Sequence, residues 1–143
     1  MRITICGSII FTNEIKKIKD KLEKQGHQVN IPFTSEKILN EELTLEEYKR
    51  EKEKGEDVKR KIDDNVIKRY YDLIKDSDAI LVVNITKNNI KNYIGGNTFL
   101  EIGFAHVLNK KIYLFHDIPQ VSYSDEIEAM RPIVINSNLK LIK

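Results

Sequence analysis

The chain alternates between short apolar runs and longer segments in which apolar residues recur at helical spacing. The short runs predict buried strands over 3–7, 28–31, 79–85, 112–115 and 133–135. The segments of helical spacing predict helices over about 12–25, 63–75, 98–109 and 124–130. In the helix over 63–75, this spacing is expected to turn four residues inward: Val66, Ile67, Tyr70 and Ile74.

This alternation of strands and helices indicates an α/β fold. The most apolar strands have no polar face, which is typical of a parallel sheet covered by helices on both sides. We therefore expect a single domain over 1–143, built as a three-layer sandwich around a parallel, flavodoxin-like or Rossmann-like sheet of about five strands. In such sheets ligands bind beyond the carboxyl ends of the strands, where the loops at 7–11, 84–97 and 116–123 would lie.

One segment, over about 36–61, departs from this alternation because glutamate and lysine dominate it. Thr44 and Glu47 have the spacing of a capping box and predict a helix start, and Gly55 is expected to interrupt the helix. The segment is interpreted either as a solvated helical excursion or as a mobile cover over a nearby site.

Composition and charge limit the classes of function. The 143 residues are 41% hydrophobic and 32% charged, with a net charge of +2, which fits a folded domain. No apolar run is long enough to span a bilayer, no signal-peptide pattern opens the chain, and the single cysteine, Cys6, excludes an intramolecular disulfide. We therefore expect a cytoplasmic protein without a membrane partner. No basic patch with interleaved aromatic residues indicates a nucleic-acid polymer.

The histidines do not indicate a metal site. His27, His106 and His116 have no metal-ligand spacing with one another, so we expect neither a metal nor another cofactor. His106 falls in the most apolar predicted helix, which we expect to be buried, and it is interpreted as a hydrogen-bonded core histidine.

The most informative stretch is a glycine loop, Gly95-Gly96, directly before that apolar helix, with one carboxylate, Glu101, in the expected first turn. Thr98 and Glu101 match a capping box, so Glu101 can be explained as a helix cap. The alternative is a catalytic group held ionised by the helix dipole, because an ionised carboxylate can attack an anomeric carbon. Tyr93 in the same loop either stacks on a base or packs the loop.

Several segments together resemble the nucleoside 2-deoxyribosyltransferase-like superfamily, which includes 2'-deoxynucleoside 5'-monophosphate N-glycosidases. The resemblance is carried by the stretches 6–9 (Cys-Gly-Ser-Ile), 77–82 (Ser-Asp-Ala-Ile-Leu-Val), 101–105 (Glu-Ile-Gly-Phe-Ala), 110–112 (Lys-Lys-Ile) and 128–130 (Glu-Ala-Met). It spans most of the chain and skips the charged segment. The order and spacing of these stretches carry the resemblance, since each is short.

This resemblance implies roles for individual residues. Glu101 would be the nucleophile that attacks C1' of a nucleoside, Gly7 and Ser8 would contact the sugar, and Glu128 and Met130 would reach a neighbouring subunit in a homodimer. The other substrate-binding candidates come from the loop before the apolar helix: Asn84, Tyr93, Gly95, Gly96, Asn97 and Thr98.

The chain departs from the family pattern at two places. Where the family has an acidic residue that assists the leaving base, this chain has Tyr70, and Asp72 is the nearest candidate for that role. The monophosphate N-glycosidases also carry a basic residue soon after the Gly-Ser pair, where this chain has Ile9, Ile10 and Phe11. The resemblance therefore does not extend to a 5'-phosphate preference.

The leading hypothesis is an enzyme that cleaves or transfers at the N-glycosidic bond of a nucleoside or nucleotide. The alternative is a nucleotide-binding or sensing domain of the same fold without turnover. The substrate in both cases is a small molecule.

Overall fold

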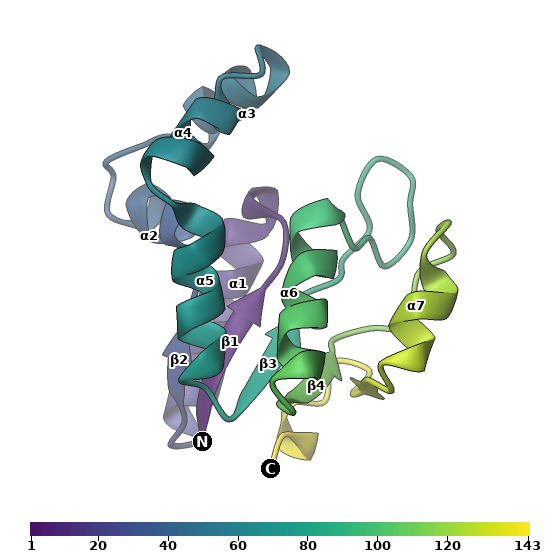
Figure 1. Ribbon diagram of the computed structural model, residues 1–143. Helices are drawn as coiled ribbons and strands as arrows, with labels where there is room; N and C mark the ends of the chain where they lie inside the picture. The colour runs from purple at the N-terminus through teal and green to yellow at the C-terminus, as the bar shows by residue number, and fades with distance from the viewer.

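The computed structural model describes all 143 residues, and its centre is one parallel sheet of five strands in the order β2-β1-β3-β4-β5 (Figure 1). The strands are β1 (Arg2–Cys6), β2 (Gln28–Asn30), β3 (Ala79–Val82), β4 (Lys111–Leu114) and β5 (Ile133–Val134). The helices are α1 (Thr12–Lys24), α2 (Phe33–Leu39), α3 (Leu45–Glu53), α4 (Asp57–Asp63), α5 (Val66–Lys75), α6 (Gly96–Val107) and α7 (Ser124–Ala129), with short 3-10 helices η1 (Ile9–Phe11) and η2 (Leu139–Leu141). This arrangement confirms the predicted three-layer α/β class. None of the helices combines the length and the apolarity needed to cross a membrane.

Two hydrophobic cores lie on opposite faces of the sheet because successive strand residues point to opposite sides. Ile3 and Ile5 of β1 face the first core, where α1 and η2 pack. Cys6 at the end of the same strand faces the second core, which is covered by α5, α6 and α7. Both faces of the sheet are thus buried, and this explains why β3 is apolar at every position.

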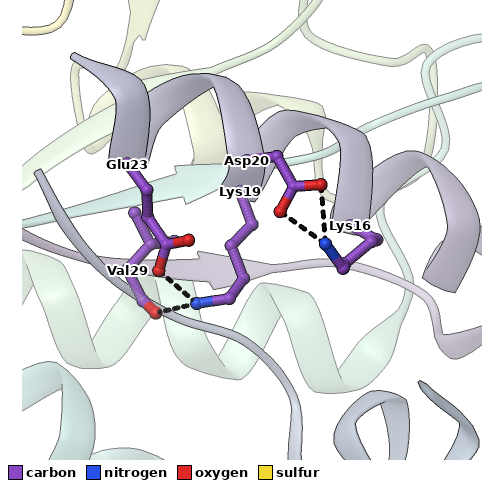
Figure 2. A network of polar contacts seen from close by, with 5 residues as sticks. All are labelled: Lys16, Lys19, Asp20, Glu23 and Val29. Atoms are coloured by element: carbon purple, nitrogen blue, oxygen red, sulfur yellow. Dashed lines mark hydrogen bonds and ion pairs between the residues drawn. The ribbon is translucent and has the colours of Figure 1, made fainter.

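Two surface ion pairs lie within α1, and a hydrogen bond from one of their lysines reaches the edge strand β2 (Figure 2). Lys16 pairs with Asp20 at 2.5 Å, and Lys19 pairs with Glu23 at 2.5 Å while also donating to the Val29 carbonyl at 3.0 Å. Pairs of this kind contribute only about 0.3–0.5 kcal/mol each. Two of the five lysines of this helix, Lys16 and Lys19, therefore have acidic partners.

The charged segment forms two helices, α3 and α4, that stand beyond the carboxyl end of the sheet (Figure 1). The predicted capping box is present: the Glu47 amide donates to the Thr44 hydroxyl at 3.0 Å, and the Thr44 amide donates to the Glu47 carboxylate at 3.1 Å. Gly55, with a φ of 70°, separates the two helices as expected, because this left-handed conformation favours glycine.

The outer faces of α5 and α6 are more exposed than their apolar sequences predict. Ile67 is 46% exposed and Val107 is 71% exposed, so the expectation of an inward Ile67 and of a fully buried α6 is wrong. His106 is also exposed and is not a core residue. The reason is that α6 packs on the sheet through Ile102 and Ala105 and packs beside α5, which leaves His106 and Val107 on its solvent-exposed side.

Asn84 joins the ends of β3 and β4. Its buried side chain accepts from the His116 amide at 2.9 Å and donates to the carbonyls of His116 at 3.0 Å and Asp117 at 2.9 Å. These bonds use its amide group within the protein, and Asn84 does not line the cavity described below. The structure therefore places this substrate-binding candidate in a supporting role.

Replacing Asn84 with alanine is expected to lower the free energy of unfolding by about 2 kcal/mol or more, since buried backbone groups would lose their partners. Urea unfolding measures this change. Asn13→Ala, at an exposed position of α1, serves as the control and should stay within about 0.5 kcal/mol of the unchanged protein. Unchanged stability together with lost ligand binding would instead make Asn84 a ligand contact.

Candidate functional site

A cavity of about 240 Å³ lies at the carboxyl edge of the sheet. The chain runs from β1 outward to β2 and then returns to the other side of β1 to form β3, so the strand order reverses between β1 and β3. Open parallel sheets bind ligands at such a reversal. Gly7 after β1, Phe33 after β2 and Glu101 of α6 all line the cavity, which makes it the candidate site.

Most of the residues predicted for the site meet at this cavity. Glu101 lines it together with Gly7, Ser8, Tyr93, Gly95, Gly96, Asn97 and Thr98. The sequence left the charged segment as either a solvated excursion or a mobile cover over a nearby site, without naming residues. Its helices α3 and α4 add a wall to the cavity: Tyr48, Lys52, Asp57, Arg60 and Lys61. Segments far apart in sequence therefore enclose one space.

Glu101 is not a helix cap. Helix α6 begins at Gly96 with Gly95 as its N-cap, and no acidic residue lies in its first turn. Thr98 is thus inside the helix, the capping box with Glu101 does not form, and Glu101 lies in the second turn. The extended backbone of Gly95 starts the helix earlier than the sequence pattern predicted.

The surroundings of Glu101 favour its protonated form. Burial raises its pKa from 4.5 to about 8, and the nearby Cys6 thiol acts in the opposite direction. The residue keeps some accessible surface because it borders the cavity. The expectation that the helix dipole holds Glu101 ionised is wrong: the dipole effect fades beyond the first turn, and burial is the larger effect here.

Tyr70 occupies the position where the resemblance implies an acidic residue. Its side chain lines the cavity beside Glu101, and its hydroxyl donates to the Ile5 carbonyl. Phe33 packs edge-on against its ring, with the ring centroids 5.8 Å apart. Burial raises the pKa of Tyr70 well above its usual value, and the nearby Cys6 and Glu101 add to this effect. Tyr70 therefore lines the cavity, and its hydroxyl proton is already used in a hydrogen bond to the backbone.

Three further candidates lie outside the cavity. Asp72 is exposed and pairs with Lys68 at 2.5 Å on the outer side of α5, so the structure does not bring it to Glu101. A helix turns by about 100° per residue, and two positions therefore place Asp72 on a different face from Tyr70. Glu128 is exposed, Met130 packs against the second core, and neither lines the cavity.

Two tyrosines contact the loop before α6: the Tyr123 hydroxyl donates to the Ile94 carbonyl, and the Tyr93 ring packs on Gly95. A Cβ added to Gly95 would lie 2.8 Å from the Tyr93 hydroxyl, so a larger residue there would displace this ring. On its other side, the Lys87 ammonium lies 5.0 Å from the ring centroid. Tyr93 therefore packs the loop, while its place in the cavity lining also leaves it available to a ligand.

Cations are the part of the site that sequence analysis missed. Lys52, Arg60, Lys61 and Lys87 line the cavity, against the acidic Asp57 and Glu101. In the sequence the first three are hidden among many other charges of a segment that reads as solvent-exposed. One feature of the sequence indicates that α3 has a buried side: Tyr48 is its one aromatic residue.

The arrangement can support acid–base or nucleophilic chemistry at a single carboxyl group. Two carboxyl groups line the cavity, those of Asp57 and Glu101. Asp57 pairs with Lys61 at 3.3 Å, whereas Glu101 forms no ion pair. No group of three or more metal-ligating side chains comes together in the protein.

The pKa of Glu101 predicts a pH dependence of stability. A carboxyl whose pKa is raised to about 8 by folding binds more protons in the folded state, so the free energy of unfolding should fall from about pH 4.5 to about pH 8. Urea unfolding across this range should show the fall in the unchanged protein and a clearly smaller one in Glu101→Gln, with the variant the more stable at pH 8. Parallel curves would contradict the raised pKa.

Comparison with known proteins leaves the family of this chain open. No family model matches the sequence, and no curated protein matches it either. Among solved structures, the chain is similar to a CMP N-glycosidase of Clostridium botulinum, with 20% identity over 95% of this chain and 90% of that chain and a TM-score of 0.49. A likeness this distant carries no argument about function, which depends on the site itself.

Proposed function

We propose that this protein cleaves or transfers the N-glycosidic bond of a nucleoside or nucleotide, with Glu101 as the nucleophile. The observation that carries the proposal is a single unpaired carboxyl with a strongly raised pKa in a cavity at the strand reversal. Perturbed carboxyls in clefts are typical of functional sites. The motif around Glu101, with its family resemblance, supports the sugar as the reacting group.

The proposed reaction has two steps. An ionised Glu101 oxygen attacks C1' of the sugar, the C1'–N bond breaks, and the base leaves with the bonding electrons and takes a proton from solvent. Water or a second base then attacks C1' and gives up one proton to solvent, and the C1'–O bond to Glu101 breaks to release its carboxylate. Because Asp72 lies outside the cavity, no side-chain acid is assigned to the leaving base.

A non-catalytic nucleotide-binding domain is the second candidate. The observation that favours it is the locked hydroxyl of Tyr70 where an acidic group would assist the departing base. Such a protein would bind nucleosides or nucleotides and release no product.

Self-association and location are also part of the proposal. Leu100 is 46% exposed and Val107 is 71% exposed, and they lie two turns apart on the same outer face of α6. Covering this face with a second copy would bury apolar surface that a monomer leaves in water. We propose a homodimer through this face.

The single, buried Cys6 fits a reducing compartment such as the cytoplasm.

Glu101→Gln is expected to reduce base release or exchange at least about 1000-fold, because it removes the nucleophile while keeping its shape. Incubation of the protein with nucleosides, nucleotides and free bases, followed by chromatography, measures this loss. In the unchanged protein the rate should rise with pH up to about 8, since only ionised Glu101 can attack.

The matched control for this experiment is Asp72→Asn, which removes a carboxylate outside the cavity and should leave the rate unchanged. A rate that falls with rising pH would make Glu101 a general acid rather than a nucleophile. Ligand binding without any product would favour the binding domain, and equal rates in Glu101→Gln and the unchanged protein would reject both roles.

Introducing a charge on the exposed face of α6 is expected to convert the dimer to a monomer. Val107→Glu would place a carboxylate in the proposed interface, and light scattering after size exclusion would report the mass. Leu141→Glu is the control, because Leu141 is 50% exposed on η2, which packs on the other side of the sheet. A monomeric unchanged protein at micromolar concentration would overturn this part of the proposal.

A further inference from the structure

The cavity wall opposite the sheet carries more positive charge than the protein itself neutralises. Four cations line the cavity, and two of them form ion pairs: Lys61 with Asp57 at 3.3 Å, and Arg60 with Glu51. The other two, Lys52 of α3 and Lys87 of the loop before α6, form none. They come from separate segments of the chain, so the fold and not local sequence brings them together.

Lys52 and Lys87 have no acidic partner. Neither forms an ion pair, and Lys87 donates only to the Ser8 hydroxyl, at 3.0 Å. Both lysines line the same cavity. Partial burial, followed by the positive charge of Lys52, lowers the pKa of Lys87. Two like charges held at one cavity repel unless an anion lies between them.

Arg60 has an unused hydrogen-bond donor. Its Nη2 atom pairs with Glu51, and this pair joins α4 to α3. Its Nη1 atom is buried and forms no hydrogen bond. Every other buried side-chain nitrogen or oxygen atom of the protein has a hydrogen-bond partner. Buried polar groups are nearly always satisfied, so an exception requires an explanation. The Arg60 side chain lines the cavity, so a rotation of its guanidinium group would bring this donor to a ligand oxygen there.

We propose that Lys52, Arg60 and Lys87 form the binding site for a phosphate group carried by the substrate, with the Ser8 hydroxyl as a further donor. The proposal rests on the proposed function, because it specifies the substrate of the same cavity as a phosphorylated nucleoside. Ammonium and guanidinium groups form short, charge-assisted hydrogen bonds to phosphate oxygens. A phosphate would also remove the repulsion between the two lysines.

This assignment gives the charged segment a role. The residues after the Gly7-Ser8 pair are Ile9, Ile10 and Phe11, which supply no cation near the first strand end. Helices α3 and α4 place their cations across the same cavity instead. The segment that resembled a solvated excursion thus becomes the part of the protein that distinguishes nucleotides from nucleosides.

Calorimetric titration of the full chain tests the phosphate site. The probes are the 5'-monophosphates of the four common nucleosides and the matching nucleosides, and the Glu101→Gln background prevents turnover. The best-bound monophosphate should bind at least about tenfold more tightly than its nucleoside. Lys52→Gln and Lys87→Gln should each weaken monophosphate binding by about tenfold more than they weaken nucleoside binding, which is the effect of one charge-assisted hydrogen bond.

Lys49→Gln is the matched control, because Lys49 is an exposed lysine of α3 outside the cavity. Using two separate lysines keeps the test valid if one variant folds poorly. Equal binding of monophosphate and nucleoside, an equal effect of Lys49→Gln and Lys52→Gln, or no binding of either monophosphates or inorganic phosphate would overturn the proposal.

Inorganic phosphate tests whether the site binds the phosphate group of a nucleotide or free phosphate as a co-substrate. It should compete with the monophosphate, since both place phosphate oxygens against the same cations. If nucleosides are cleaved only in the presence of free phosphate, and a sugar phosphate forms, then the site serves a co-substrate and the proposal is wrong. Tight, lysine-dependent monophosphate binding without cleavage by the unchanged protein would contradict the proposed function and leave the phosphate site standing.

Discussion

The parallel pairing of β1 with β3 is the constraint on which the rest of this structure depends. It sets Cys6 beside Val82 and makes both strands interior to the sheet, with helices on each face. Parallel strands need crossover connections, so the carboxyl ends of all strands meet at one edge. The loops after β1 and β3 therefore converge, and a cavity between them follows from the topology rather than from any single side chain.

Polar groups at this edge divide into two kinds. Asn84 and Tyr70 are buried, and both use their polar groups in hydrogen bonds to the backbone. Asn84 bonds to the chain just after β4, and Tyr70 donates to the Ile5 carbonyl of β1. Glu101 is surrounded by the same core yet has no cationic partner, and burial raises its pKa to about 8. A carboxyl in such a place costs stability above its normal pKa, which is common where a group is kept for chemistry.

The charged helices α3 and α4 line the same cavity as Glu101. They bury little apolar surface, and Tyr48 and Asp57 are their only buried residues. Their position depends on the connection between β2 and α5, which carries them over the carboxyl edge (Figure 1). The cavity thus combines a buried carboxyl at Glu101 with cations at Lys52, Arg60 and Lys87.

Local pattern in the sequence determined the strands and most helices, the parallel sheet, the capping box at Thr44, and the meeting of Gly7, Ser8 and Glu101 at one edge, because periodicity and strand polarity report burial directly. It did not determine which way residues one or two positions apart would face. Tertiary structure alone excluded Asp72, opened the outer side of α6, moved the start of that helix to Gly96 and set the pKa of Glu101. It also brought Arg60 and Lys87 together, since burial and the approach of distant charges arise only when the chain is folded.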